Sequence, residues 1–219
     1  MVPDLSTRIG AINVPVGRSD GASETLRVAP ATLDEGPRVV DVIGAAFMRD
    51  PTWSWAFPDP DARRRWWQVC VHEALRYPWV LCTGGFEAVA VWIPPDRSEF
   101  SAAEESRLPD FVRELVGRRA PEVTELLRRF GDAHPRHAPH YYLSLLATAD
   151  EHRGRGLGIA LLRENLARID LEGRPAYLES SNPGNNPRYQ SLGFVPVTSF
   201  QAPGDGPLVT GMWREGRTP

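Results

Sequence analysis

The chain has 219 residues, 42% of them hydrophobic, and a formal net charge of −3. This length is enough to bury a sizeable core in one domain. The weakly acidic charge gives no general attraction to nucleic acid, and no apolar run approaches the roughly 18 residues of a membrane-spanning helix. Two cysteines are too few for a disulfide framework, so we expect a cytoplasmic protein with neither nucleic-acid nor membrane partners.

Residues 1–24 contain scattered Gly, Ser, Pro and Asp, a composition typical of a disordered tail. We therefore expect a single folded domain over residues 25–219. Apolar periodicity and turn residues predict the elements of its first two thirds. The expected strands are 25–29, 79–83, 86–93 and 141–148, and the expected helices are 32–47, ended by Pro51, then 61–77, and 101–130 with a break near Pro121.

A glycine-rich turn, Arg153-Gly-Arg-Gly-Leu-Gly158, lies between the strand expected at 141–148 and an amphipathic run over 157–171. Closely spaced glycines let the backbone turn tightly and bring its N–H groups up to a ligand. The helix that follows adds unpaired amides and the positive end of its dipole. Two arginines in the turn supply cationic donors. The turn therefore predicts a site for a phosphate or pyrophosphate group.

The spacing of this turn excludes two common phosphate motifs. A P-loop ends in Gly-Lys-Ser/Thr, and that ending does not occur here. A dinucleotide-binding fingerprint that begins with Gly154 and Gly156 needs a third glycine where Ile159 stands. The ligand is therefore expected to be a different phosphate-bearing molecule.

Two motifs in this half of the chain resemble those of a known family. The order Arg153-x-x-Gly156-x-Gly158 resembles the acyl-CoA pyrophosphate loop of the GCN5-related N-acetyltransferases, the GNAT superfamily. Further along, Tyr189 followed by Gly193-Phe194 is similar to the family's Tyr-x-x-x-Gly-Phe signature. Within the superfamily, puromycin N-acetyltransferase and its actinobacterial relatives have stretches similar to residues 45–51, 87–95 and 177–189.

The order of the elements indicates an α/β fold with a central mixed, mostly antiparallel sheet and helices on both faces. The strands at 141–148 and 176–180 are joined by a helix, so they should run parallel. The resemblance implies a sheet of about six to seven strands in which this parallel pair splays apart at its C-terminal ends. The gap would admit the pantetheine arm of acyl-CoA.

The resemblance also implies acetyl-CoA as the acyl donor and CoA as a product. Main-chain groups near the end of the strand would bind the pantetheine arm, and the turn would bind the pyrophosphate. The implied residues are Leu146, Ala147 and Thr148 on the strand, Arg153, Gly154, Arg155, Gly156, Leu157 and Gly158 in the turn, and Asn185 and Tyr189 after them. The N–H group of Leu146 is the candidate that polarises the acetyl carbonyl.

The implied reaction is direct acetyl transfer to an amine in a ternary complex. A phenol with an ordinary pKa of about 10 is protonated at neutral pH, so Tyr189 is the candidate that gives a proton to the leaving thiolate. The alternative is that Tyr189 packs in the core. Glu179 is the candidate base, and its alternative is a structural carboxylate paired with an arginine.

Aromatic residues are candidates for the walls of an acceptor pocket, namely Phe47, Trp53, Trp55, Phe57 and Tyr142. Aromatic walls suit an aromatic or heterocyclic amine, although most of these residues fit packing between helices or a dimer seam equally well. We expect a small-molecule amine acceptor, such as an antibiotic, a biosynthetic intermediate or another toxic amine, and a monomer or homodimer. A protein or peptide acceptor and a non-catalytic acyl-CoA-binding module are the alternatives.

Three histidines, His134, His137 and His140, lie close together in the sequence. Prolines at 135 and 139 interrupt any helical ligand face, and no Cys, Asp or Glu completes a ligand set. We therefore expect a solvated loop and no metal site. His140 and Tyr142, which enter the central strand, remain candidates for contact with the acceptor.

Overall fold

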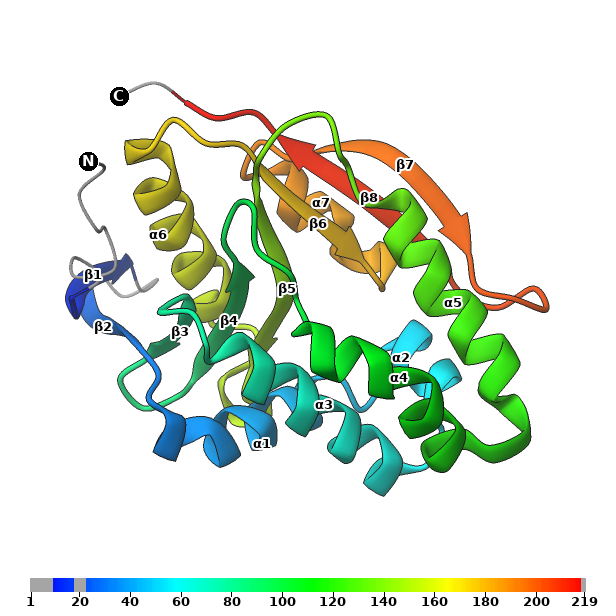
Figure 1. Cartoon of the computed structure of the whole chain (residues 1–219). Coiled ribbons are helices and arrows are strands. Elements are labelled where there is room, and N and C mark those ends of the chain that lie inside the picture. The colour runs from blue at the N-terminus through cyan, green and yellow to red at the C-terminus, as the bar shows by residue number, and fades with distance from the viewer. Residues whose placement is uncertain (1–9, 18–22, 218–219) are drawn as a thin grey trace.

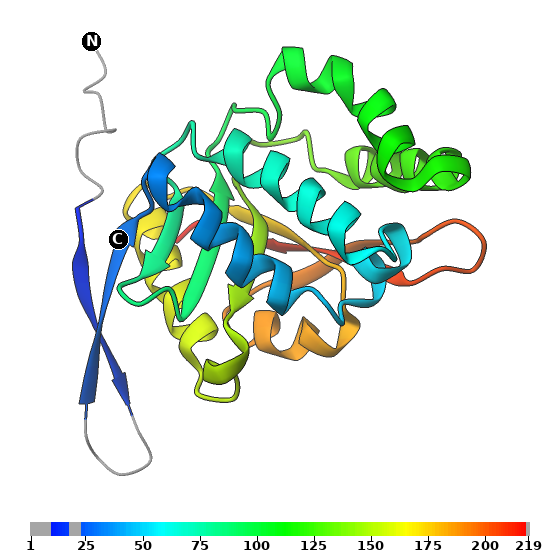
Figure 2. The ribbon, with the colours of Figure 1, turned by 90° about the horizontal axis from the view of Figure 1, so that it is seen from below.

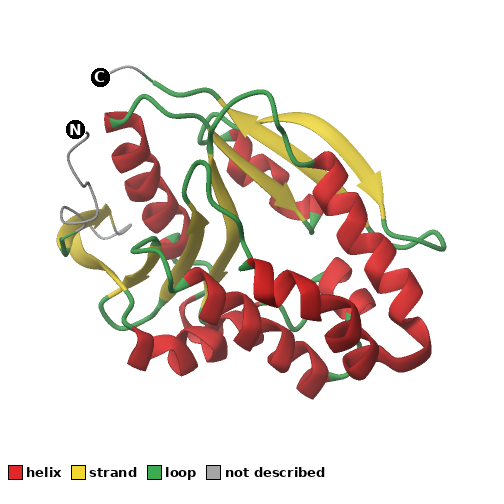
Figure 3. Ribbon diagram, viewed as in Figure 1, coloured by secondary structure: helices red, strands yellow, loops and turns green. Residues whose placement is uncertain are grey.

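The computed structural model describes residues 10–17 and 23–217. In this part of the chain, one eight-stranded sheet is covered by helices on both faces (Figure 1 and Figure 3). The strands are β1 (Ile12–Gly17), β2 (Ser23–Pro30), β3 (Val80–Thr83), β4 (Ala88–Ile93), β5 (Tyr141–Thr148), β6 (Ala176–Ser180), β7 (Val195–Gln201) and β8 (Leu208–Arg214). The helices are α1 (Gly36–Ala46), α2 (Pro51–Ala56), α3 (Pro60–Ala74), α4 (Ala102–Val116), α5 (Ala120–Ala133), α6 (Leu157–Leu171) and α7 (Asn186–Gln190).

The strand order in the sheet is β1-β2-β3-β4-β5-β6-β8-β7. Neighbouring strands are antiparallel except β5 and β6, which run parallel because α6 connects them. The predicted fold class, a mixed and mostly antiparallel sheet with helices on both faces, is confirmed. The sheet has eight strands where about six to seven were expected, because β1, which lies within the range 1–24 where we expected a tail, pairs with β2. Residues 1–9 and 18–22 lie outside the described residues.

Two prolines begin helices instead of ending or breaking them. Asp50 caps α2, since its carboxylate accepts hydrogen bonds from the N–H groups of Thr52 and Trp53, both at 3.0 Å. Pro51 therefore occupies the first turn of α2, where a missing N–H group costs nothing. Pro121 likewise lies at the start of α5, and the break before it falls at Gly117, whose φ is +55°.

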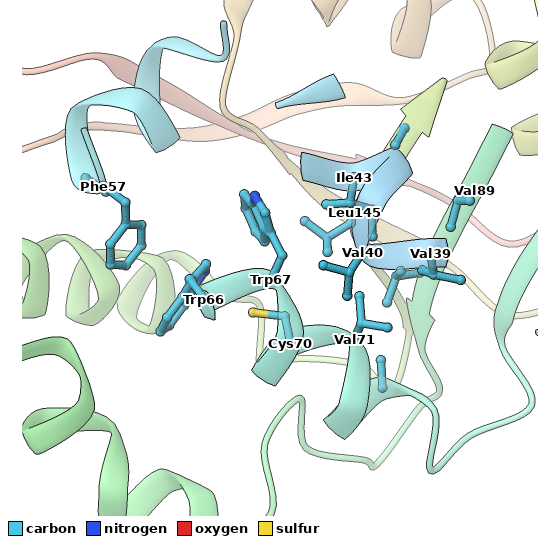
Figure 4. Packing of buried hydrophobic residues seen from close by; sticks show 14 of the residues in the cluster. Val39, Val40, Ile43, Phe57, Trp66, Trp67, Cys70, Val71, Val89 and Leu145 are labelled. Carbon is cyan, nitrogen blue, oxygen red and sulfur yellow. The ribbon is translucent and has the colours of Figure 1, made fainter. Parts of the chain in front are cut away.

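The larger of two hydrophobic cores lies between one face of the sheet and helices α1, α3, α4 and α5. In Figure 4, Trp66 and Trp67 of α3 lie between Phe57, which follows α2, and Ile43 of α1. Each of these four side chains is almost completely buried. Removing a side chain such as Ile43 from water contributes about 1.5–3 kcal/mol, so this packing fixes α1, α2 and α3 on the sheet.

The smaller core lies on the opposite face, where α6 packs against β4 and β5. A β-bulge in β5 changes which residues of this strand point toward each face of the sheet. Val91 of β4 pairs with Leu145, but the next residue, Trp92, pairs with Leu143, so Ser144 is the extra residue. As a result, Leu143 belongs to the α6 core and Leu145 to the α1–α3 core.

Helices α4 and α5 belong to the long connection between the neighbouring strands β4 and β5. They pack against each other and lie beside α3, at the end of the molecule away from β1 (Figures 1 and 2). This helical pair therefore covers the region next to the C-terminal ends of β5 and β6. Within the described residues, no helix has both the length and the apolar character needed to cross a bilayer.

Candidate active site

The parallel strands β5 and β6 diverge at a defined point. They pair only from Tyr141 to Leu143 on β5 and from Ala176 to Leu178 on β6, although both strands continue further. Figure 1 shows the two strands separating toward their C-terminal ends. The expected splay is confirmed. Beyond the divergence, main-chain groups on the facing edges lack the neighbouring strand as a partner, so they can bind a ligand.

The glycine turn leads directly into α6. Gly154 and Gly156 both have a φ of +77°, a left-handed conformation that glycine adopts at little cost, and Gly156 is the N-cap of α6. A Cβ atom on either residue would meet nothing within 4 Å, so this side of the turn faces open space. A Cβ atom on Gly158, in contrast, would lie 2.6 Å from Thr148 Oγ1. Because glycine has no Cβ atom, the turn can lie close to the end of β5.

Both arginines of the turn have partners within the protein. Arg153 forms a salt bridge with Asp150 at 2.7 Å, and it also donates to the carbonyl oxygen of Ala46 at 2.7 Å. Arg155 Nη1 lies 2.8 Å from His152 Nδ1. These contacts fix the shape of the turn. The N-terminal amides of α6 have, by helix geometry, no partner one turn earlier, so they are available to bind an anion.

A cavity of about 770 Å³ opens beside the divergence of β5 and β6. Its walls come from α2, α3, α4, α5, β5, β6, α7 and the loops at 94–100 and 134–140, so the tertiary structure assembles it from distant parts of the sequence. The predicted site residues that line it are Phe47, Trp53, Tyr142, Leu146, Glu179, Asn185 and Tyr189. The glycine turn lies outside this lining, at the end of β5.

Two predicted acceptor-binding residues lie elsewhere. Phe57 is completely buried and its ring stacks on Trp66 with centroids 5.1 Å apart, so it belongs to the core. Trp55 packs under the guanidinium of Arg119, 4.8 Å from the ring centroid, and does not line the cavity. Neither residue therefore lines the cavity, and within α2 only Trp53 does so.

Glu179 lines the cavity, and only 2% of its side chain is exposed. Its Oε2 atom makes no hydrogen bond with any described residue, and its Oε1 atom lies 3.7 Å from Nδ1 of His134. Burial raises the pKa values of Tyr142 and Tyr177, and the Glu179 carboxylate raises them further. The expected alternative, a structural pair with an arginine, is not what the structure shows: the basic residue beside Glu179 is His134.

A second acid of the cavity, Glu99, was not predicted. It lies between β4 and α4, and the hydroxyl of Ser144 donates a hydrogen bond to its carboxylate. Burial raises the pKa of Glu99, and the nearby Glu179 adds to this, whereas the Ser144 hydrogen bond lowers it. Since Ser144 is the bulge residue of β5, the bulge holds Glu99 next to the divergence. Glu99 is a single acidic residue in a connecting segment, so no sequence pattern predicts its place in the cavity.

The segment from His134 to His140 is partly buried, and it is not the solvated loop that we expected. His140 is only 8% exposed, and His134 and His140 both line the cavity. Their Nε2 atoms lie 3.1 Å apart, while Nδ1 of His140 lies 2.8 Å from the carbonyl oxygen of Ala138. Burial lowers the pKa of His140. Among the described residues, no group of three or more His, Cys, Asp or Glu side chains is arranged to hold a metal ion.

Tyr189 packs against a core residue and also lines the cavity. Its ring packs against Phe194, with centroids 6.3 Å apart, and the residue also lines the cavity. Burial raises the pKa of Tyr189 to about 12, and the nearby Asp50 carboxylate contributes to this rise. The phenol is therefore protonated at neutral pH. Asn185, also on the lining, accepts a hydrogen bond from Arg188 at 2.6 Å.

No family model matches the chain, but solved acetyltransferase structures are similar to it over most of its length. A Corynebacterium glutamicum structure, described as histone acetyltransferase HPA2 and related acetyltransferase, has 26% identity and a TM-score of 0.62, covering 94% of this chain and 98% of that chain. Two structures of lower identity share the fold. A putative arylalkylamine N-acetyltransferase 7 of the yellow fever mosquito has 13% identity and a TM-score of 0.59, covering 94% of both chains. An agmatine N-acetyltransferase has 15% identity and a TM-score of 0.59, covering 87% of this chain and 99% of that chain.

Proposed function

Because the chain belongs to the GCN5-related N-acetyltransferase superfamily and is an acyltransferase, we propose that it transfers the acetyl group of acetyl-CoA to the amine of a small molecule. The divergence of β5 and β6 carries this proposal. It opens the sheet between an anion-binding turn on one side and an acidic, aromatic cavity on the other. A long thioester anchored at the turn can therefore reach an amine bound in the cavity.

The residues of the turn and of β5 fit acetyl-CoA. Gly154 and Gly156 leave open space beside the N-terminal amides of α6, where a pyrophosphate would bind. The edge of β5 that faces the gap would pair with the amide groups of the pantetheine arm. When bound, acetyl-CoA supplies the thioester that the amine attacks. The N–H group of Leu146 is the proposed donor to the acetyl oxygen, as in an oxyanion hole.

The amine must lose a proton before it can attack, because an alkylammonium with a pKa of about 10 is charged at neutral pH. Glu179 is the proposed base, since it lines the cavity and its Oε2 atom has no hydrogen-bond partner among the described residues. Glu99, held by Ser144, adds a second acidic side chain to the same region. An acidic lining of this kind favours a cationic acceptor.

Tyr189 is the proposed partner of the leaving thiolate. Its pKa of about 12 keeps it protonated, so its hydroxyl can donate a hydrogen bond. Complete proton transfer to sulfur would be uphill, because an ordinary thiol has a pKa of only about 8.5. We therefore propose that Tyr189 stabilises the developing thiolate by hydrogen bonding, and that solvent later supplies the proton.

The acceptor is proposed to be a small amine with an apolar or aromatic body. A cavity volume of about 770 Å³ lies within the range of roughly 300–1,000 Å³ that small-molecule sites occupy. Phe47, Trp53 and Phe130 supply aromatic surface on its lining. Two of the similar structures are named for acetylation of arylalkylamines and agmatine. The resemblance to puromycin N-acetyltransferase, and with it an antibiotic acceptor, stays a prediction.

The test is acetyl-CoA turnover, followed as release of free thiol, across a panel of primary alkylamines, arylalkylamines, arylamines, hydrazines and short peptides. We expect turnover with one or more small amines and none with the peptides. Binding of CoA is measured in parallel by calorimetry. Tight CoA binding without turnover on any acceptor would contradict the proposed reaction and support a binding module. Turnover on peptides alone would instead indicate a protein acceptor.

A further inference from the structure

We propose that His134 carries out of the cavity the proton that Glu179 removes from the acceptor, and that His140 fixes the tautomer of His134 for this task. The proposal rests on the proposed function. It answers a difficulty created by burial: with 2% of its side chain exposed, Glu179 has little direct contact with solvent. His134, beside it, has 34% of its side chain exposed.

The tautomer of His140 follows from its partners. Its Nδ1 atom lies 2.8 Å from the carbonyl oxygen of Ala138, and a carbonyl oxygen can only accept, so Nδ1 must carry the hydrogen. Burial lowers the pKa of His140, which favours the neutral ring. In a neutral ring with Nδ1 protonated, the Nε2 atom has a lone pair and accepts hydrogen bonds.

The tautomer of His134 follows in turn. Its Nε2 atom lies 3.1 Å from Nε2 of His140 and must donate to that lone pair. The remaining ring atom, Nδ1 of His134, faces Oε1 of Glu179 at 3.7 Å. His134 Nδ1 is therefore the position at which this pair of residues gains or loses a proton. A small ring movement would bring it into hydrogen-bond distance of Glu179, as catalytic contacts often tighten when substrate binds.

The proposed transfer moves one proton through three atoms. The acceptor ammonium gives its proton to the Glu179 carboxylate, which leaves the amine neutral with its lone pair free to attack. The resulting carboxylic acid passes the proton to His134 Nδ1, which forms an imidazolium. The imidazolium then releases it to solvent, restoring the neutral ring and the carboxylate. Each step moves a proton only, and no other reactant is required.

Other titratable groups face this pair. Tyr142 and Tyr177 carry protons throughout the neutral range, because burial and Glu179 raise their pKa values. Glu99 interacts with both Glu179 and His134, and its pKa is raised. His137 also influences His140. A pH profile alone would therefore mix several titrations, so the test compares two acceptors at a single pH.

The decisive variant is His134→Gln. The glutamine amide can still donate to His140 but has no atom that takes the place of the Nδ1 base. An alkylamine needs deprotonation at neutral pH, whereas an arylamine such as an aniline is already neutral. In single turnovers with saturating acetyl-CoA, we expect the alkylamine rate to fall about 10- to 100-fold, with little change in the arylamine rate. His72→Gln, which removes an exposed histidine on α3, is the matched control.

A second variant tests the tautomer directly. In His140→Asn the side-chain amide can still donate toward Ala138, but the acceptor for His134 is removed, so the same selective loss is expected. Equal losses with both amines, or no loss with either, would overturn the relay. These results are distinguishable from failure of the proposed function, because in that case the unmodified enzyme would acetylate neither amine.

Discussion

Asp50 and Ser181, separated by 131 residues in the sequence, are joined by a hydrogen bond of 2.7 Å from the serine hydroxyl to the carboxylate. The hydroxyl of Thr52 also donates to the carbonyl oxygen of Ser181, at 2.8 Å. Both bonds are buried. They attach the first turn of α2 to the end of β6, just beyond Glu179, so the aromatic wall and the proposed base are held in one rigid unit.

Replacing Ser181 by Ala should destabilise the protein, because it leaves a buried carboxylate oxygen without its donor. A hydrogen bond to a charged group contributes about 1.5–3 kcal/mol, and we expect the free energy of unfolding in urea to fall by about that amount. Ser106→Ala is the control, since Ser106 is exposed and bonds only within α4. Equal stability of the two variants would contradict the proposed attachment.

Gly156→Ala should weaken CoA binding, measured by calorimetry. The substitution forces a side chain into the left-handed region, at a cost of about 1–2 kcal/mol, and places a methyl group where the pyrophosphate is proposed to bind. Gly173→Ala, just beyond the other end of α6, is a matched control because its φ of +62° imposes similar strain. We expect both variants to lose a similar amount of stability, but only Gly156→Ala to lose affinity for CoA. Weakened CoA binding in both variants would indicate a general effect of strain.

Tyr189→Phe should lower kcat about 10- to 100-fold while CoA affinity stays nearly unchanged, since the variant keeps the packing on Phe194 and loses only the hydroxyl. Tyr77→Phe is the control, since Tyr77 does not line the cavity and its hydroxyl bonds only to the carbonyl oxygen of Ser98, and it should have little effect. An unchanged kcat in Tyr189→Phe would leave packing as the only role of this residue.

Trp53→Leu should raise KM for amine acceptors about 5- to 10-fold, equivalent to about 1–1.5 kcal/mol of lost aromatic contact. Trp55→Leu is the matched control on the same helix, because Trp55 packs against Arg119 and does not line the cavity. Steady-state kinetics with an arylalkylamine would measure both. A larger effect of Trp55→Leu would place the acceptor elsewhere.

The raised pKa of Glu99 predicts how stability depends on pH. Above pH 4.5, the ordinary value, and up to the folded pKa, the native state binds more protons than the unfolded state at this residue. The free energy of unfolding should therefore fall as pH rises through this window. In Glu99→Gln this contribution is lost, so the variant should gain stability relative to the unmodified protein as the pH rises above 4.5. Urea unfolding of both proteins across this range measures the difference in stability. If the free energies of unfolding of the two proteins changed in parallel with pH, the prediction would be contradicted.

The sequence by itself determined the elements on the cofactor side of the site. It predicts a strand over 141–148 and a helix over 157–171, the same bounds as β5 and α6. Alternating apolar residues, helical periodicity and closely spaced glycines act within one short segment, so their structural effect can be derived without knowing the rest of the fold. The parallel pairing of β5 and β6 follows from the helix between them.

Only the tertiary structure decided the acceptor side. Whether Trp53 or Phe57 faces the cavity depends on the packing of α2 against α3, and the positions of Glu99 and His134 depend on a bulge at Ser144 and on the path of α5. The charge, burial and hydrogen bonding of such side chains arise from partners far away in the sequence, so no local pattern encodes them. The glycine turn could be derived from its own residues, whereas the Glu179–His134–His140 arrangement exists only because three segments meet.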